Sequence, residues 1–109
     1  MGLRETILQA NDLPTKDVYV PEWGQTVTVS ALNIVQRNSF ELAVRGKPQD
    51  EQIASWVAWT IREDGLQVFT LEDVPELMRK SAAALMRVFE VVAELNALSG
   101  SDVEEIAGN

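Results

Sequence analysis

The sequence contains no cysteine and no histidine. The lack of cysteine excludes disulfides, thiolate nucleophiles and structural zinc sites built on sulfur. The lack of histidine removes the commonest general base and the commonest metal ligand. Catalysis would then require paired carboxylates, a lysine or a carboxylate-bound Mg²⁺, each with several polar groups converging on one pocket. We therefore expect a protein that is not an enzyme, uses no cofactor or metal, and works by binding other proteins.

Basic residues are also scarce, with nine Lys and Arg against seventeen Asp and Glu and a net charge of −8. Affinity for DNA normally comes from clustered Lys and Arg, and anionic membrane surfaces attract the same residues. No apolar run approaches the roughly 18 residues that span a membrane, and the N-terminus lacks the apolar stretch of a signal peptide. We therefore expect no nucleic-acid partner and no membrane partner, and the acidic charge favours solubility.

The length and apolar content predict one folded domain over residues 1–109, since 46% of the 109 residues are hydrophobic. The fold class expected is α+β. It comprises a small antiparallel sheet of two hairpins, at about residues 17–31 and 55–69, packed with four to five helices.

Alternating residues predict the first hairpin. Val18 and Val20 alternate with polar residues before a Pro-Glu-Trp-Gly turn at 21–24, and Val27 and Val29 alternate after it. The second hairpin is centred on Asp64-Gly65, a strong hairpin turn. Its first half is ambiguous, because residues 51–60 fit helical spacing as well as strand spacing. The β-branched and tryptophan residues there favour a strand.

Capping residues mark the helices. Asn33, Thr70 and Ser81 are suitable N-caps, and Ser101 begins a capping box with Glu104. The predicted helices cover residues 3–10, about 34–44, 71–80, 82–98 and a last turn at 102–106.

The longest predicted helix, 82–98, is apolar around most of its circumference. One stripe is predicted to lie in the core together with two tryptophans; these core residues are Leu85, Phe89, Val92, Trp23 and Trp59. Further apolar residues flank this stripe on both sides: Met86, Ala93, Val91 and Leu98. Either the domain itself covers both flanks, or one flank binds another subunit or a client helix. We predict these four residues as the protein-binding surface.

Several segments occur in an order typical of one protein family. They include Leu-Arg-Glu at 3–5, Val-Pro-Glu-Trp-Gly at 20–24, Glu-Asp-Gly at 63–65, Phe-Thr-Leu-Glu-Asp-Val at 69–74 and Lys-Ser-Ala-Ala-Ala-Leu at 80–85. Together they resemble the tail assembly chaperones of siphophages, in the short form made without frameshifting. The similarity covers nearly the whole chain except residues 37–59.

The resemblance implies a non-enzymatic function in the host cytoplasm. Such chaperones coat the tape measure protein and keep it soluble until tail tube subunits polymerise around it. They assemble into spirals or rings and are absent from the mature virion. The resemblance also implies a longer form, made by programmed −1 ribosomal frameshifting, that recruits the tail tube protein. Ala-Gly-Asn at 107–109 is compatible with a slippery G-GGA-AAC heptamer if Ala107 is encoded by GCG.

An acidic inhibitor or DNA mimic is the alternative function. Such a protein should carry a dense stripe of carboxylates spaced like phosphates. Here the acidic residues lie mostly at predicted turns and helix ends, where local structure already explains them.

Overall fold

The computed structural model describes residues 2–98, and within them the fold is α+β, as predicted. Five α-helices, a 3₁₀ helix and a four-stranded antiparallel sheet make up these residues. In chain order they are α1 (Leu3–Gln9), β1 (Thr15–Val20), β2 (Gln25–Ser30), α2 (Ile34–Val44), α3 (Gln49–Thr60), β3 (Ile61–Glu63), β4 (Leu66–Gln67), η1 (Leu71–Asp73), α4 (Val74–Leu77) and α5 (Ala82–Leu95). The predicted turn at 102–106 and the segment 107–109 lie outside the described residues.

The sheet has the order β1-β2-β3-β4 with antiparallel neighbours throughout. Val20 pairs with Gln25 at the end of the first hairpin, and Val29 pairs with Ile61 to join the two hairpins. The predicted turn at 21–24 is confirmed, with Gly24 at a φ of 61° that glycine adopts without a steric cost.

The second hairpin is much shorter than the predicted range of 55–69. Its turn at Asp64-Gly65 is confirmed, with φ values of 53° and 78°. The prediction of a strand over residues 55–60 is wrong, because these residues form the second half of α3. Every residue from Ile53 to Ala58 is buried. The helix therefore has no polar face in this stretch, and without alternating polar and apolar faces the sequence shows no helical period.

The starts of α1, α2 and α5 are as predicted. The helix predicted over 71–80 is shorter, because the 3₁₀ helix η1 leads into α4, which ends at Leu77. Asn33 and Gln36 form a capping box at α2, and the Ser81 side chain accepts the Ala84 N–H at α5. Helix α5 ends at Leu95, three residues before the predicted Leu98.

A local hydrogen-bond pattern explains this early end. The Leu98 N–H donates to the Ala93 carbonyl at 3.0 Å, and the Ala97 N–H donates to the Glu94 carbonyl at 3.3 Å. Ala97 has a φ of 51°. These bonds form a Schellman motif, which satisfies the last carbonyls of the helix without glycine.

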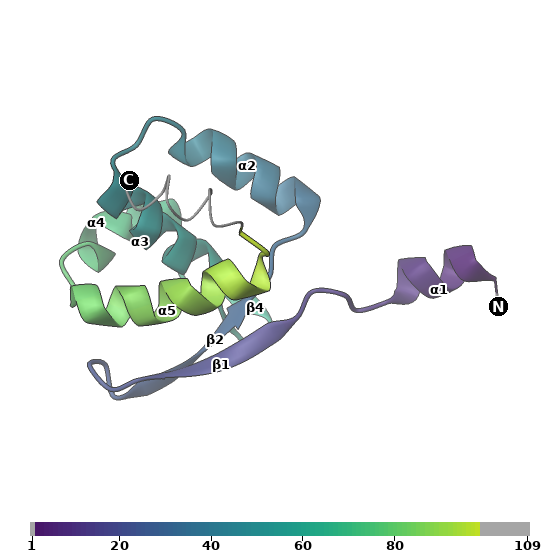
Figure 1. The fold of residues 1–109 in the computed structure, drawn as a ribbon, viewed down its shortest axis with the longest axis horizontal. Coiled ribbons are helices and arrows are strands. Elements are labelled where there is room, and N and C mark those ends of the chain that lie inside the picture. Colours follow the sequence, from purple (N-terminus) through teal and green to yellow (C-terminus); the bar gives the residue numbers. More distant parts are fainter. Residues whose placement is uncertain (1, 99–109) are drawn as a thin grey trace.

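Helix α5 lies between the β1–β2 hairpin and α3 (Figure 1). Phe40 of α2 packs on Trp56 of α3, with ring centroids 4.4 Å apart, and forms an edge-to-face pair with Trp59, with ring centroids 5.3 Å apart. The core thus joins one sheet face to three helices. Its largest fully buried side chains are Phe40, Val20, Val29, Val57, Val88, Val92 and Thr60.

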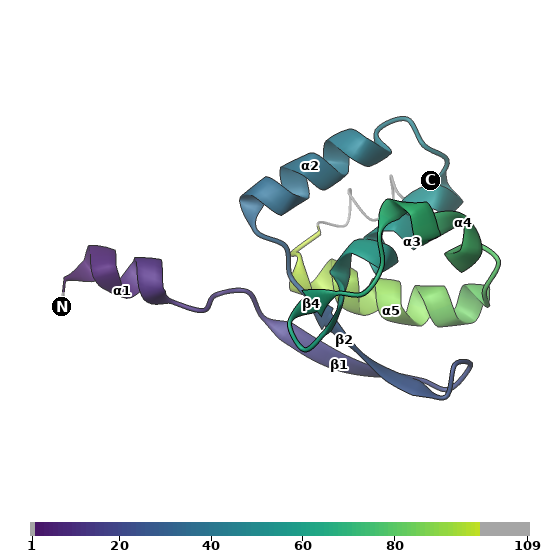
Figure 2. The same ribbon diagram turned by 180° about the vertical axis from the view of Figure 1, so that it is seen from behind.

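Helix α1 stands apart from this body at the end of an extended segment, residues 10–14 (Figures 1 and 2). None of its residues is buried. The N-terminal arm, residues 2–14, is the main departure from a compact shape.

Asn96 ties the end of α5 to the segment before α2. Its side-chain oxygen accepts the Leu32 N–H at 2.8 Å, and its amide donates to the Val92 carbonyl at 2.9 Å.

We expect Asn96→Ala to lower the free energy of unfolding by about 1–3 kcal/mol, because the buried Leu32 N–H loses its partner. Urea denaturation measures this loss. Asn38→Ala, on the exposed side of α2, is the control, and equal effects of the two variants would contradict the assignment.

Candidate protein-binding surface

The residues predicted as core on α5 are buried: Leu85, Phe89 and Val92. They belong to the main core cluster, and α5 as a whole contacts α3 and both strands of the β1–β2 hairpin. Trp23 and Trp59 are partly buried and pack against the same cluster.

The predicted binding residues of α5 differ in exposure. Met86 is 40% exposed, whereas Val91 and Leu98 are half-buried and pack against the core. Ala93 is also half-buried. The domain's own elements therefore lie against much of both flanks. Binding through these four residues stays a prediction, and within it Met86 is the side chain most accessible to a partner.

Helix α2 carries an apolar surface that the sequence analysis did not single out. We call Ile34, Val35 and Leu42 the outer stripe of α2; their exposed fractions are 85%, 71% and 58%. Val35 and Leu42 are seven residues apart and so share a face, while Phe40 and Val44 point to the core from roughly the opposite face. A helical wheel of residues 34–44 reveals both faces, but only the fold decides which one is covered.

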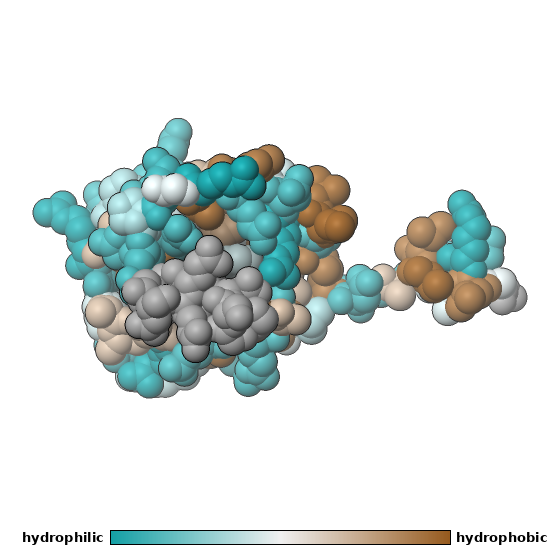
Figure 3. All heavy atoms as spheres, turned by 45° about the horizontal axis from the view of Figure 1, so that its top comes forward, coloured by the Kyte–Doolittle hydropathy of each residue, from teal (hydrophilic) through white to brown (hydrophobic). Residues whose placement is uncertain are grey.

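Helix α1 presents the second apolar surface, formed by Leu3, Ile7 and Leu8, all exposed. Figure 3 shows hydrophobic surface on α1 and on the end of α2 nearest the arm. Exposed apolar side chains gathered on one element are typical of a protein interaction site.

A hollow of about 300 Å³ lies at the end of the body that carries the β1–β2 turn. We call it the end hollow. Three apolar side chains and three charged ones line it: Trp23, Phe69, Leu77, Asp73, Glu76 and Lys80. Trp23 comes from the β1–β2 turn, Phe69 follows β4, and Leu77 belongs to α4. An apolar site with a charged rim suits the apolar side chains of a protein partner.

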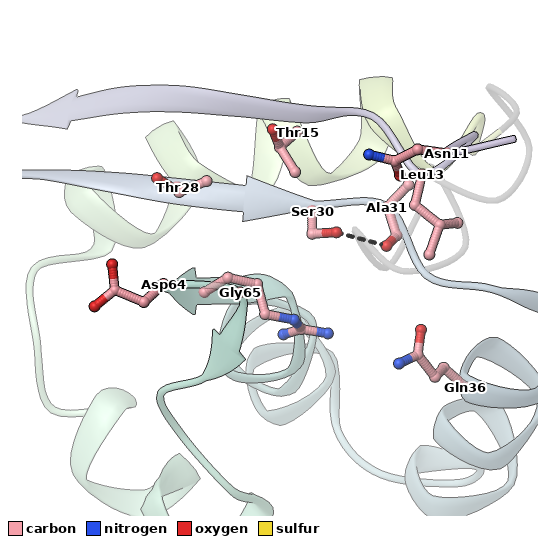
Figure 4. A pocket seen from close by; sticks show the side chains of 10 residues that line it. Asn11, Leu13, Thr15, Thr28, Ser30, Ala31, Gln36, Asp64 and Gly65 are labelled. Atoms are coloured by element: carbon pink, nitrogen blue, oxygen red, sulfur yellow. Dashed lines mark hydrogen bonds between the residues drawn. The ribbon is translucent and has the colours of Figure 1, made fainter. Parts of the chain in front are cut away.

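A larger hollow of about 450 Å³ lies over the polar face of the sheet and is lined mainly by polar residues (Figure 4). Two of its hydroxyl groups are already engaged. The Ser30 hydroxyl donates to the Ala31 carbonyl at 2.9 Å, and the Thr28 hydroxyl donates to Asp17 at 2.7 Å. These two hydrogen bonds stay within the β1–β2 hairpin and the residue that follows it.

Arg62, in the same hollow, has a structural role. Its guanidinium donates to the carbonyl oxygens of Trp59 and Ile61, at the end of α3. Partial burial lowers the pKa of Arg62. The side chain therefore caps the C-terminus of α3, where carbonyl groups lack helical partners.

Among the described residues, 2–98, no three Asp or Glu side chains gather closely enough to hold a metal ion. None of their helices has the length and apolar content needed to cross a membrane.

An ion pair holds the turn that carries Trp23. The Arg87 guanidinium on α5 donates to both carboxylate oxygens of Glu22, at 2.9 and 3.3 Å. The hydrogen bond from Arg87 lowers the pKa of Glu22, and the same bond raises the pKa of Arg87. The pair therefore ties one wall of the end hollow to the longest helix.

The contribution of this pair should depend on pH. Because the pKa of Glu22 is lowered on folding, its stabilisation is fully present above the ordinary glutamate pKa of about 4.3. The stabilisation is lost as the pH falls through the lowered pKa. Urea denaturation followed by tryptophan fluorescence should find the wild type more stable than Glu22→Gln at neutral pH, with the difference vanishing in acid. A difference that does not change with pH would contradict this role.

Comparison with known proteins gave no match to a family model, to a curated protein or to a solved structure.

Proposed function

We propose that this chain is a non-enzymatic phage tail assembly chaperone. It coats the tape measure protein, keeps it soluble in the host cytoplasm, and helps to recruit tail tube subunits through a longer frameshifted form. It self-associates into a spiral or ring and is absent from the mature virion. The proposal of this family is supported by the sequence segments that resemble those of siphophage tail assembly chaperones and occur in the same order.

The outer stripe of α2 is the observation that carries the binding function. Ile34, Val35 and Leu42 form exposed apolar surface on a helix whose other face is anchored in the core by Phe40 and Val44. An apolar stripe on a rigid helix binds the apolar face of an amphipathic client helix. The net charge of −8 keeps the resulting complex soluble.

The distribution of acidic residues favours this function over an acidic inhibitor or DNA mimic. Glu22, Glu41, Glu51 and Glu94 each lie within 4 Å of a basic side chain. Asp73 accepts the Thr70 N–H in a capping box. Carboxylates engaged in this way are not arranged to imitate a row of free phosphates.

Co-expression with the tape measure protein tests the proposal. The chain should keep that protein in the soluble fraction, and Val35→Glu/Leu42→Glu should abolish this effect, since carboxylates on the stripe oppose burial against a client. Gln25→Glu/Thr26→Glu adds the same charge at exposed positions of β2 and is the matched control. Sedimentation of the client measures the result. A client that is insoluble with the wild-type chain, or soluble with both variants, would overturn the proposal.

Met86 tests the surface predicted on α5. We expect Met86→Asp to weaken client binding with little change in stability, because the side chain is exposed. Val91→Asp should instead lower the free energy of unfolding by about 1–3 kcal/mol, because Val91 packs against the core. Pull-down of the client and urea denaturation measure the two effects. If Met86→Asp binds the client normally, α5 is not part of the binding surface.

A further inference from the structure

Helix α1 lacks the contacts that would keep it folded. It has seven residues, no side-chain N-cap at Gly2 and no buried residue. Helices this short are unstable in water on their own, because nucleation is costly and tertiary packing supplies most helical stability. Its one ion pair, Arg4 with Glu5 at 3.6 Å, is exposed and adds little. The helix therefore needs an apolar surface to dock on.

The composition of the α1 face indicates what that surface should contain. With 100° per residue, Arg4 lies between Ile7 and Leu8 on the helix surface, and Glu5 lies next to Leu8. A complementary site should have an apolar lining that accommodates the aliphatic side chains of α1. It should also carry an acidic group for Arg4 and, beside it, a basic group for Glu5.

The end hollow meets these requirements. Trp23, Phe69 and Leu77 supply its apolar lining. Its lining also includes the exposed side chains of Glu76 and Lys80, one acidic and one basic group. Among residues 2–98, neither Glu76 nor Lys80 belongs to an ion pair.

The arm lies at one end of the long axis of the molecule, which is 50 Å in extent, and the β1–β2 turn and α4, which line the end hollow, lie at the other (Figures 1 and 2). A contact between two different surfaces is heterologous, and each added copy leaves a free arm at one end and a free hollow at the other. Such contacts generate a ring when the rotation closes and an open spiral when it does not.

We propose that α1 of one copy docks in the end hollow of the next copy, with Leu3, Ile7 and Leu8 in the apolar lining and Arg4 beside Glu76. The proposed function includes self-association, and this contact is a mechanism for it. The inference rests on the proposed function in that one respect. Client binding is assigned to other surfaces, so the two proposals can fail separately.

Light scattering coupled to gel filtration tests the contact on the full-length chain. The wild type should form species larger than a dimer as concentration rises. Ile7→Glu should weaken this association by about tenfold or more, because docking would bury a carboxylate among apolar side chains. Gln9→Glu, elsewhere on α1, adds the same charge and should not change it. A monomeric wild type, or equal effects of the two variants, would overturn the proposal.

A charge exchange tests the pairing of Arg4 with Glu76. Arg4→Glu and Glu76→Arg should each weaken association, and the double variant should recover it. Glu72→Arg, which is exposed on η1 outside the hollow, is the control for Glu76→Arg. Absence of recovery in the double variant would refute the pairing.

Mixing two variants tests the head-to-tail geometry. Ile7→Glu has a damaged arm and an intact hollow, whereas Glu76→Arg has an intact arm and a damaged hollow. Their mixture should form one-to-one dimers and no larger species. A mixture that remains monomeric would mean that the arm docks on its own chain or elsewhere, and would overturn the proposal. If client solubility is retained in Ile7→Glu, the chaperone function stands without this contact.

Discussion

Helix α3 has no solvent-facing residue from Ile53 to Ala58, and the placement of the other helices depends on covering it. Helices α5, α4 and α2 all contact α3. The chain passes directly from Thr60 of this helix into β3 at Ile61, so the position of the helix also sets the position of the second hairpin. Close packing of a small core around the buried part of this helix leaves little tolerance for changes in side-chain volume.

The packing of other helices on α3 also determines which apolar surfaces remain exposed to solvent. Helix α2 covers it with Phe40 and Val44, and this orientation turns Val35 and Leu42 to solvent. Helix α1 contributes no residue to the core at all. A domain of 109 residues has few elements with which to cover every apolar face, and the acidic charge compensates by opposing aggregation.

Polar contacts then hold the ends of the elements. Asn96 connects the end of α5 to Leu32, and the Glu22–Arg87 pair connects the β1–β2 turn to the middle of α5. Both contacts join segments far apart in the sequence. They position the end hollow and the start of α2, which are two of the places where binding is proposed.

Local chemistry allowed much of this fold to be predicted from the sequence. Asn33, Thr70 and Ser81 cap helices through bonds to residues two or three positions away, and Asp64-Gly65 needs only its own backbone preferences to turn. Contacts over long range decided the rest. Residues 55–60 are helical because neighbouring elements bury all of them except Trp59, which is partly buried. Helix α2 exposes Val35 because Phe40 faces α3. An apolar residue indicates that burial is favourable, but only the tertiary structure determines whether the domain itself supplies the surface that buries it.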